Sequence, residues 1–177
     1  MIINRAWDMP NKLTFSIPSI SKFLTRSLMP LNGKIIIDPF ANRNHGFATK
    51  YNDINPNNYG SNLDALEFLK SFDDCSVDCV LFDPPYSLRQ LKECYEGIGK
   101  SLTHYDTTSY FTDVKNEISR VVKPGGMVIS FGWNSIGIGK KNGFEIKEIL
   151  LVSHGGQHND TIVTLEVNNQ RRLTTWC

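Results

Sequence analysis

Four consecutive residues carry the most specific chemical signal in the chain: Asp83, Pro84, Pro85 and Tyr86. They follow an apolar run, residues 77–82, whose composition predicts a strand buried inside a sheet. The strand must end at Asp83, because two successive prolines have no N–H to donate to a neighbouring strand. The carboxylate, the Pro84 carbonyl and the tyrosine ring are therefore expected together at a strand's carboxyl end, where open α/β sheets bind ligands.

This corner suits transfer of a methyl group to the exocyclic amino group of a planar base. Such a nitrogen is a poor nucleophile, because its lone pair is delocalised into the ring. If the Asp83 carboxylate and the Pro84 carbonyl each accept one N–H hydrogen bond, they offset the positive charge that grows during attack. Tyr86 would stack on the base and align nitrogen, methyl carbon and sulfonium sulfur. The alternative is that the prolines only end a strand and that Tyr86 is a surface residue of a turn.

Composition sets broad limits on the function. The chain has 177 residues, 40% apolar and 21% charged, which fits a single domain over residues 1–177. Its formal charge is +1, so a surface for nucleic acid has to be local. Neither a secretion signal nor a membrane-length apolar run is evident, and we expect a cytoplasmic protein without a membrane partner. The cysteines and histidines lack the spacing of zinc ligands, and no metal site is expected.

Strand-like and helix-like segments alternate after residue 33. Strands are expected at 34–38, 47–51, 77–82, 127–131, 144–152 and 161–167, and helices at 63–72 and 108–122. The last two strands should pair antiparallel, because the loop between them is too short for a crossover helix. The order predicts an α/β fold with a doubly wound, mostly parallel sheet and an antiparallel terminal hairpin. Residues 87–107 fit neither pattern and are expected to form a long substrate loop.

The turn after the first strand is the expected cofactor site, since sheets of this class bind cofactors there. In this chain it begins with Asp38, Pro39 and Phe40. Asp53 follows the second strand at about the distance where an acidic residue binds ribose hydroxyls in dinucleotide-binding sheets. Both aspartates also have a structural interpretation, Asp38 as a cap of the next turn and Asp53 as part of an Asn-Asp turn.

Together these motifs resemble the amino-methyltransferases that use S-adenosylmethionine, specifically the Asp-Pro-Pro-Tyr group that methylates adenine N6 in DNA. The small phage and prophage enzymes are most similar, and the resemblance runs from Lys34 to Val167. It implies a Rossmann-like class I methyltransferase fold, S-adenosylmethionine as cofactor and DNA as partner. It also implies roles: residues 38–40 as the cofactor motif, Asp53 as the ribose acid, Asp64 and Ala65 as the adenine contact, and residues 83–86 as the catalytic motif.

The turn after the cofactor motif departs from the family pattern. The family usually has a glycine-rich turn there, whereas this chain has Ala41 and Asn42. Asparagine adopts positive φ more readily than most residues and partly meets that need. In these enzymes a segment before the first strand, here within residues 1–33, often folds back onto the cofactor. Phe15 would then cover the cofactor, or it packs against the sheet.

The substrate side leaves several alternatives open. Arg89 would contact DNA phosphate, or it is a solvated surface charge. Trp133 would form a wall of the base pocket opposite Tyr86, or it belongs to the core.

Target recognition has no obvious separate domain, because little chain is left between or after the motifs. It would come from residues 87–107, from the loop at 137–143, or from a second subunit in a homodimer or a complex with a partner. The remaining alternatives for function are the same fold acting on cytosine N4, an RNA base or a protein amide, or a catalytically silent scaffold that binds nucleic acid.

Overall fold

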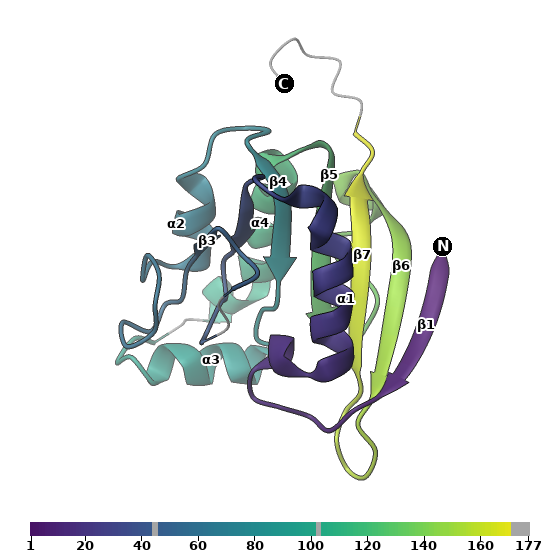
Figure 1. The fold of residues 1–177 in the computed structure, drawn as a ribbon. Helices are drawn as coiled ribbons and strands as arrows, with labels where there is room; N and C mark the ends of the chain where they lie inside the picture. The colour runs from purple at the N-terminus through teal and green to yellow at the C-terminus, as the bar shows by residue number, and fades with distance from the viewer. Residues whose placement is uncertain (44–45, 102–103, 171–177) are drawn as a thin grey trace.

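A computed structural model describes residues 1–43, 46–101 and 104–170, without the side chains of residues 104–108. In these ranges the chain forms one seven-stranded sheet flanked by helices (Figure 1). The strands are β1 (Ile2–Trp7), β2 (Ile36–Asp38), β3 (Lys50–Tyr51), β4 (Val77–Phe82), β5 (Val122–Gly132), β6 (Phe144–Ser153) and β7 (Thr161–Asn168). The helices are α1 (Pro18–Leu28), α2 (Ala65–Lys70), α3 (Leu88–Glu96) and α4 (His104–Val121). None of the helices in the described part of the chain is long and apolar enough to span a bilayer.

The strand order across the sheet is β1-β6-β7-β5-β4-β2-β3. The pairs β1–β6, β2–β3, β2–β4 and β4–β5 are parallel, whereas β7 runs antiparallel to both β5 and β6. The predicted fold class, a mostly parallel sheet with an antiparallel terminal hairpin, is therefore confirmed.

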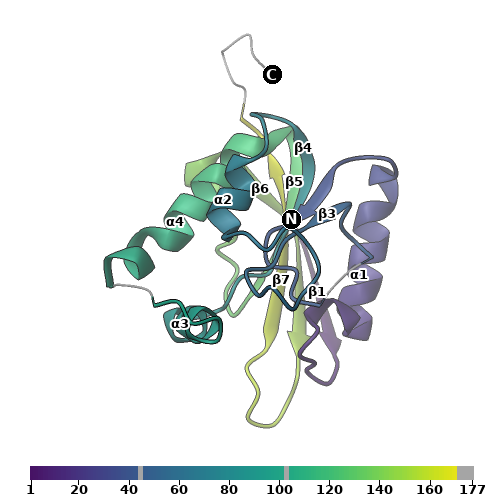
Figure 2. The ribbon, with the colours of Figure 1, turned by 90° about the vertical axis from the view of Figure 1, so that its left-hand side faces the viewer.

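Helices cover both faces of the sheet, with α1 on one face and α2, α3 and α4 on the other (Figures 1 and 2). In α1, Ile20, Phe23 and Leu24 recur at helical spacing and are buried against the first face. In α4, Val114 and Ile118 do the same on the second face, where both are fully buried. The two cores fix the sheet between them and leave its strand ends free to form a site.

The first 33 residues contain a strand and a helix that the sequence analysis did not predict. β1 joins the sheet edge beside β6, and most of its residues are exposed. An exposed edge strand need not alternate apolar and polar residues, which is why its pattern gave no signal. Pro18 occupies the first turn of α1, where the missing N–H costs nothing.

The prediction of a long loop over residues 87–107 is wrong for its first half, because residues 88–96 form α3. The Ser87 side chain caps this helix by accepting a hydrogen bond from the Gln90 N–H at 3.2 Å. Leu91 and Tyr95, four residues apart, bury its inner face. Two buried apolar positions in nine residues give too weak a periodicity to predict a helix from the sequence. Residues 102 and 103 of that segment lie outside the described residues.

Smaller differences concern element boundaries. The expected strand at 47–51 is reduced to β3, two residues long, and α4 begins at His104 rather than 108. Residues 123–126, expected to separate helix from strand, lie within β5 as an irregularity. The register there jumps from the pair Val77–Val122 to the pair Cys79–Met127. Gly125, with φ of 78°, supplies the conformation that this jump needs.

Candidate functional site

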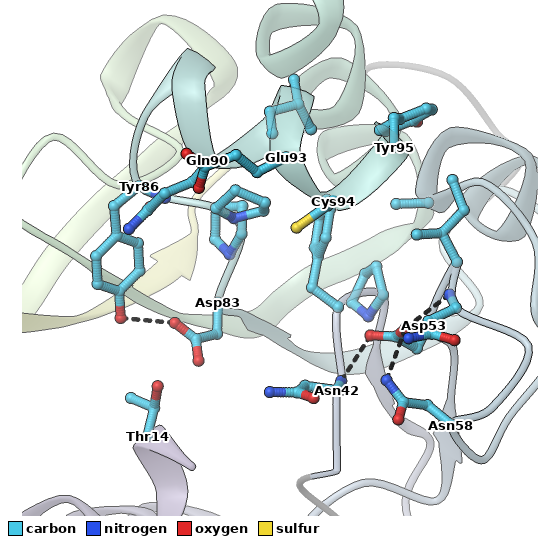
Figure 3. A pocket seen from close by; sticks show the side chains of 18 of the residues that line it. Thr14, Asn42, Asp53, Asn58, Asp83, Tyr86, Gln90, Glu93, Cys94 and Tyr95 are labelled. Carbon is cyan, nitrogen blue, oxygen red and sulfur yellow. Dashed lines mark hydrogen bonds between the residues drawn. The ribbon is translucent and has the colours of Figure 1, made fainter. Parts of the chain in front are cut away.

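A cavity of about 550 Å³ lies at the carboxyl ends of β2 and β4. These strands are parallel neighbours, so the turn after Asp38 and the corner at Asp83 open on the same edge of the sheet. Figure 3 shows the cavity with Asp83 and Asp53 on opposite sides of it. The walls include many predicted site residues, namely Pro39, Phe40, Asp53, Ala65 and residues 83–86. The sequence motifs that lie far apart in the chain thus meet around one space.

The Asp83 carboxylate has one hydroxyl hydrogen-bonded to it and a second hydroxyl nearby. The Tyr86 hydroxyl donates to Asp83 Oδ1 at 2.7 Å, and Thr14 lies close to the same carboxylate (Figure 3). Burial raises the pKa of Asp83 to about 6, although both hydroxyls act in the opposite direction. Asp83 is therefore mainly a carboxylate, and a hydrogen-bond acceptor, at neutral pH.

Helix α3 holds the Pro-Pro-Tyr corner in place. The Tyr86 N–H donates to the Gln90 side-chain oxygen at 2.7 Å. Neither proline can donate a hydrogen bond, and no donor among the described residues reaches the Pro84 carbonyl. The Pro84 carbonyl oxygen is therefore available as an acceptor, next in sequence to Asp83. Gln90 was not anticipated, because the helix that carries it was not.

Trp133 contacts the corner from the end of β5. Its ring and the Tyr86 ring meet edge to face, with centroids 5.6 Å apart and planes 76° apart. Trp133 is 43% exposed, so the core interpretation does not hold for this residue. Trp133 does not line the large cavity but lines a smaller one, which Tyr86 also lines.

Asp53 holds the turns at the other end of the cavity together. Its carboxylate accepts hydrogen bonds from the backbone N–H groups of Asn42 and Asn55, at 2.9 and 2.8 Å, and from the Asn58 side chain at 2.9 Å (Figure 3). Asn42 has φ of 51°, the left-handed conformation that a glycine would otherwise supply. A carboxylate offers about four acceptor positions, so these three bonds leave Asp53 room for about one further donor.

Asp38 lies beneath the cavity rather than in its wall. It is 1% exposed, and its Oδ1 accepts a hydrogen bond from the Phe40 N–H at 3.0 Å. Burial raises its pKa well above the usual range, and the charges of Asp83 and Asp53 add to this effect. Asp38 therefore shapes the turn that presents Pro39 and Phe40. This geometry agrees with the capping interpretation of Asp38.

Asp64 does not line the cavity but contacts residues that do. One oxygen caps α2 by accepting a hydrogen bond from the Leu66 N–H at 2.8 Å. The other accepts hydrogen bonds from the hydroxyls of Tyr95 and Tyr110, which themselves line the cavity. Ala65, next in sequence, lines the cavity directly. Tyr95 was not anticipated as a cavity residue, because it belongs to α3.

Phe15 and Arg89, like Trp133, Asp38 and Asp64, are absent from the cavity wall. Phe15 is 4% exposed and packs against Phe131, with ring centroids 4.9 Å apart, so its position matches the packing alternative. Its neighbour Thr14 lines the cavity instead, together with Lys12. The Arg89 side chain is 87% exposed and pairs with Glu93 at 2.8 Å, one turn along α3. Arg89 thus stands on the outer surface, where a surface charge was the alternative.

No family model matches the chain, and no curated protein matches its sequence. Solved structures do match the fold. TrmN from Thermus thermophilus aligns with a TM-score of 0.55 at 17% identity, over 86% of this chain and 49% of TrmN. The N-methyltransferase NodS from Bradyrhizobium japonicum aligns with a TM-score of 0.53 at 9% identity, over 88% of this chain and 99% of NodS. The fold is Rossmann-like, of the class I methyltransferase type. The chain spans about half the length of TrmN.

Proposed function

We propose that the protein is an S-adenosylmethionine-dependent methyltransferase that acts on the N6 amino group of adenine in DNA. The cavity that joins Asp53 to the Asp83 corner carries this proposal. One end offers a carboxylate for hydroxyl groups, and the other offers two acceptor oxygens for an amino group. The shared fold of TrmN and NodS supports the reaction class. The Asp-Pro-Pro-Tyr sequence supports adenine as the acceptor.

The residues around the cavity fit S-adenosylmethionine, which supplies an electrophilic methyl carbon when bound. The acceptor position left on Asp53 suits a ribose hydroxyl. Phe40 and Ala65 offer apolar surface for the purine. Lys12 lines the cavity and carries the positive charge that an amino-acid carboxylate requires. Asp38 and Asp64 would act through the turns they hold, without touching the cofactor.

Asp83 has to exchange a partner before it can bind the base. Its Oδ1 now accepts the Tyr86 hydroxyl, and the adenine amino group would replace that hydrogen bond. The Pro84 carbonyl would accept the second N–H. Both oxygens then favour the positive charge that develops on nitrogen. Once released, Tyr86 is free to place its ring against the base. Extruding the base from a duplex costs a few kcal/mol, because the base must unstack from its neighbours.

We propose that surfaces of this chain, or a second subunit, recognise the DNA target. Lys140 and Lys141 are exposed in the loop at 137–143, and α3 brings Arg89 to the surface beside the cavity. So few candidate contacts among the described residues favour a short or loosely specified recognition site. Sequencing of methylated DNA after expression measures the site, and a long, strict consensus would contradict this expectation.

The proposal is tested by incubating the purified protein with labelled S-adenosylmethionine and, separately, DNA, RNA and protein. We expect label in DNA, on adenine, and none after the change Asp83→Ala. S-adenosylhomocysteine should still bind that variant in a calorimeter, since the far end of the cavity is unchanged. Label on cytosine, RNA or protein would replace the acceptor that we propose. Absence of S-adenosylhomocysteine binding to the unmodified protein would favour a silent scaffold.

A further inference from the structure

A second cavity, of about 190 Å³, adjoins the Pro-Pro-Tyr corner. Pro84, Pro85 and Tyr86 line both cavities, so the two meet at this corner. The larger cavity fits the methyl donor, as argued above. The smaller one is therefore next to a group whose amino nitrogen is held at the corner. Its volume suits a single planar ring system.

The walls of this acceptor cavity are suited to a flat, apolar ring. Phe111 comes from α4, Phe131 from β5 and Trp133 from the loop after β5. Tyr86 and Trp133 already meet edge to face, which leaves ring faces available for stacking. Aromatic walls bind every base and do not distinguish one from another. Discrimination must come from the polar groups of the cavity.

Lys115 is a polar group of this cavity without an assigned partner. It extends from α4, lines the cavity and is partly buried. It forms no ion pair with any residue that the structure describes. Burial lowers its pKa, while the nearby charge of Glu166 acts to raise it. A partly buried ammonium with no ion-pair partner is unfavourable unless a ligand supplies an acceptor.

Glu166 fixes the rim of the same cavity. This side chain is fully buried, and it accepts hydrogen bonds from the N–H groups of Ile138 and Gly139 at 2.7 and 3.0 Å. The loop that carries Trp133 is thereby tied to β7. Gly137 has φ of 56°, and a Cβ there would collide with the Glu166 carboxylate. These contacts attach the rim to β7, and a specificity site requires such support.

We propose that the smaller cavity receives the acceptor base and that Lys115 donates a hydrogen bond to the ring nitrogen beside its amino group. This inference rests on the proposed function and names its specificity residue. In adenine that nitrogen, N1, is an acceptor. Guanine has two ring nitrogens beside its amino group: N1 bears a proton and would face the Lys115 ammonium unpaired, whereas N3 is an acceptor. Lys115 therefore disfavours guanine bound through N1, because an unsatisfied donor is costly in a partly buried site.

The test is a double-mutant cycle between the enzyme and the base. Lys115→Met and an oligonucleotide with 1-deazaadenine at the target each remove one partner of the same hydrogen bond. A hydrogen bond to a charged group predicts that each change alone lowers kcat/KM roughly 10- to 100-fold. Both changes together should cost no more than one of them. An oligonucleotide with 7-deazaadenine keeps N1 and should respond to Lys115→Met as ordinary adenine does.

Controls separate this inference from the proposed function. Lys22→Met, an exposed change on the opposite face of the sheet, should leave kcat/KM within about twofold. The affinity of Lys115→Met for S-adenosylhomocysteine should equal that of the unmodified protein, because Lys115 does not line the donor cavity. Independent, multiplicative losses from the two changes would overturn the role of Lys115 and leave adenine methylation intact. Failure of the unmodified protein to methylate any base would overturn both proposals.

Discussion

Replacing Asp83 with Asn should stabilise the fold while it slows methyl transfer, because a neutral amide oxygen stabilises the developing positive charge less than a carboxylate does. In the folded protein burial raises the pKa of Asp83 from 3.8 to about 6. A carboxyl whose folded-state pKa is raised contributes stability that is fully present below pH 3.8 and is lost as pH rises through about 6. At 1.36 kcal/mol per pKa unit, the ionised carboxylate costs the fold up to about 3 kcal/mol above that range. Asparagine has nearly the same shape, can still accept the Tyr86 hydroxyl and does not ionise.

The assay is urea unfolding of both proteins at several pH values. Asp83→Asn should be the more stable protein at pH 8, by up to about 3 kcal/mol, and the difference should shrink toward pH 4. Asp78→Asn is a suitable contrast, because Lys123 pairs with Asp78 at 2.8 Å and the pKa of Asp78 is lowered. Asp78→Asn should destabilise the folded protein at pH 8, because it removes the charge that pairs with Lys123. Equal stability of Asp83→Asn and the unmodified protein at pH 8 would refute the burial argument.

Three further changes test other parts of the site. Tyr86→Phe removes a hydrogen bond that lowers the pKa of Asp83, so the acidic inflection of kcat/KM should move upward from about pH 6; an unchanged inflection would contradict the contact. Asp53→Ala should weaken S-adenosylhomocysteine binding roughly 10- to 100-fold in calorimetry, and unchanged affinity would exclude its ribose role. Gly137→Ala should lower the free energy of unfolding, measured in urea, by about 1–3 kcal/mol, because the added Cβ collides with the Glu166 carboxylate. An unchanged free energy of unfolding would show that the loop moves to accommodate the Cβ.

The parts of the fold that depend on local pattern could be predicted from the sequence. β4 was expected over residues 77–82 and forms there, because a continuous apolar run ended by two prolines has few alternatives. The antiparallel pairing of β6 and β7 followed from one loop length. β1 could not be predicted in this way, since its partner β6 lies at the other end of the chain.

The candidate site shows the same division. The Asp83 corner lines the cavity as its sequence indicated, whereas Gln90, Cys94 and Tyr95 come from a helix with too weak a pattern to predict. Phe15 and Thr14 show that a sequence pattern does not predict the directions of two adjacent side chains. They are neighbours in one short turn, yet one packs in the core and the other lines the cavity. Which of two adjacent side chains faces a ligand depends on how the turn docks against the sheet, and no local rule supplies that.

The central claim is that Asp83 holds the amino group of adenine while the neighbouring cavity holds the methyl donor. Mass spectrometry of nucleosides from the DNA of expressing cells tests it most directly. Cells that express the unmodified protein should contain N6-methyladenine above the level of cells without it, and cells that express Asp83→Ala at equal abundance should not. N6-methyladenine at the same level with both proteins, or with neither, would contradict the claim.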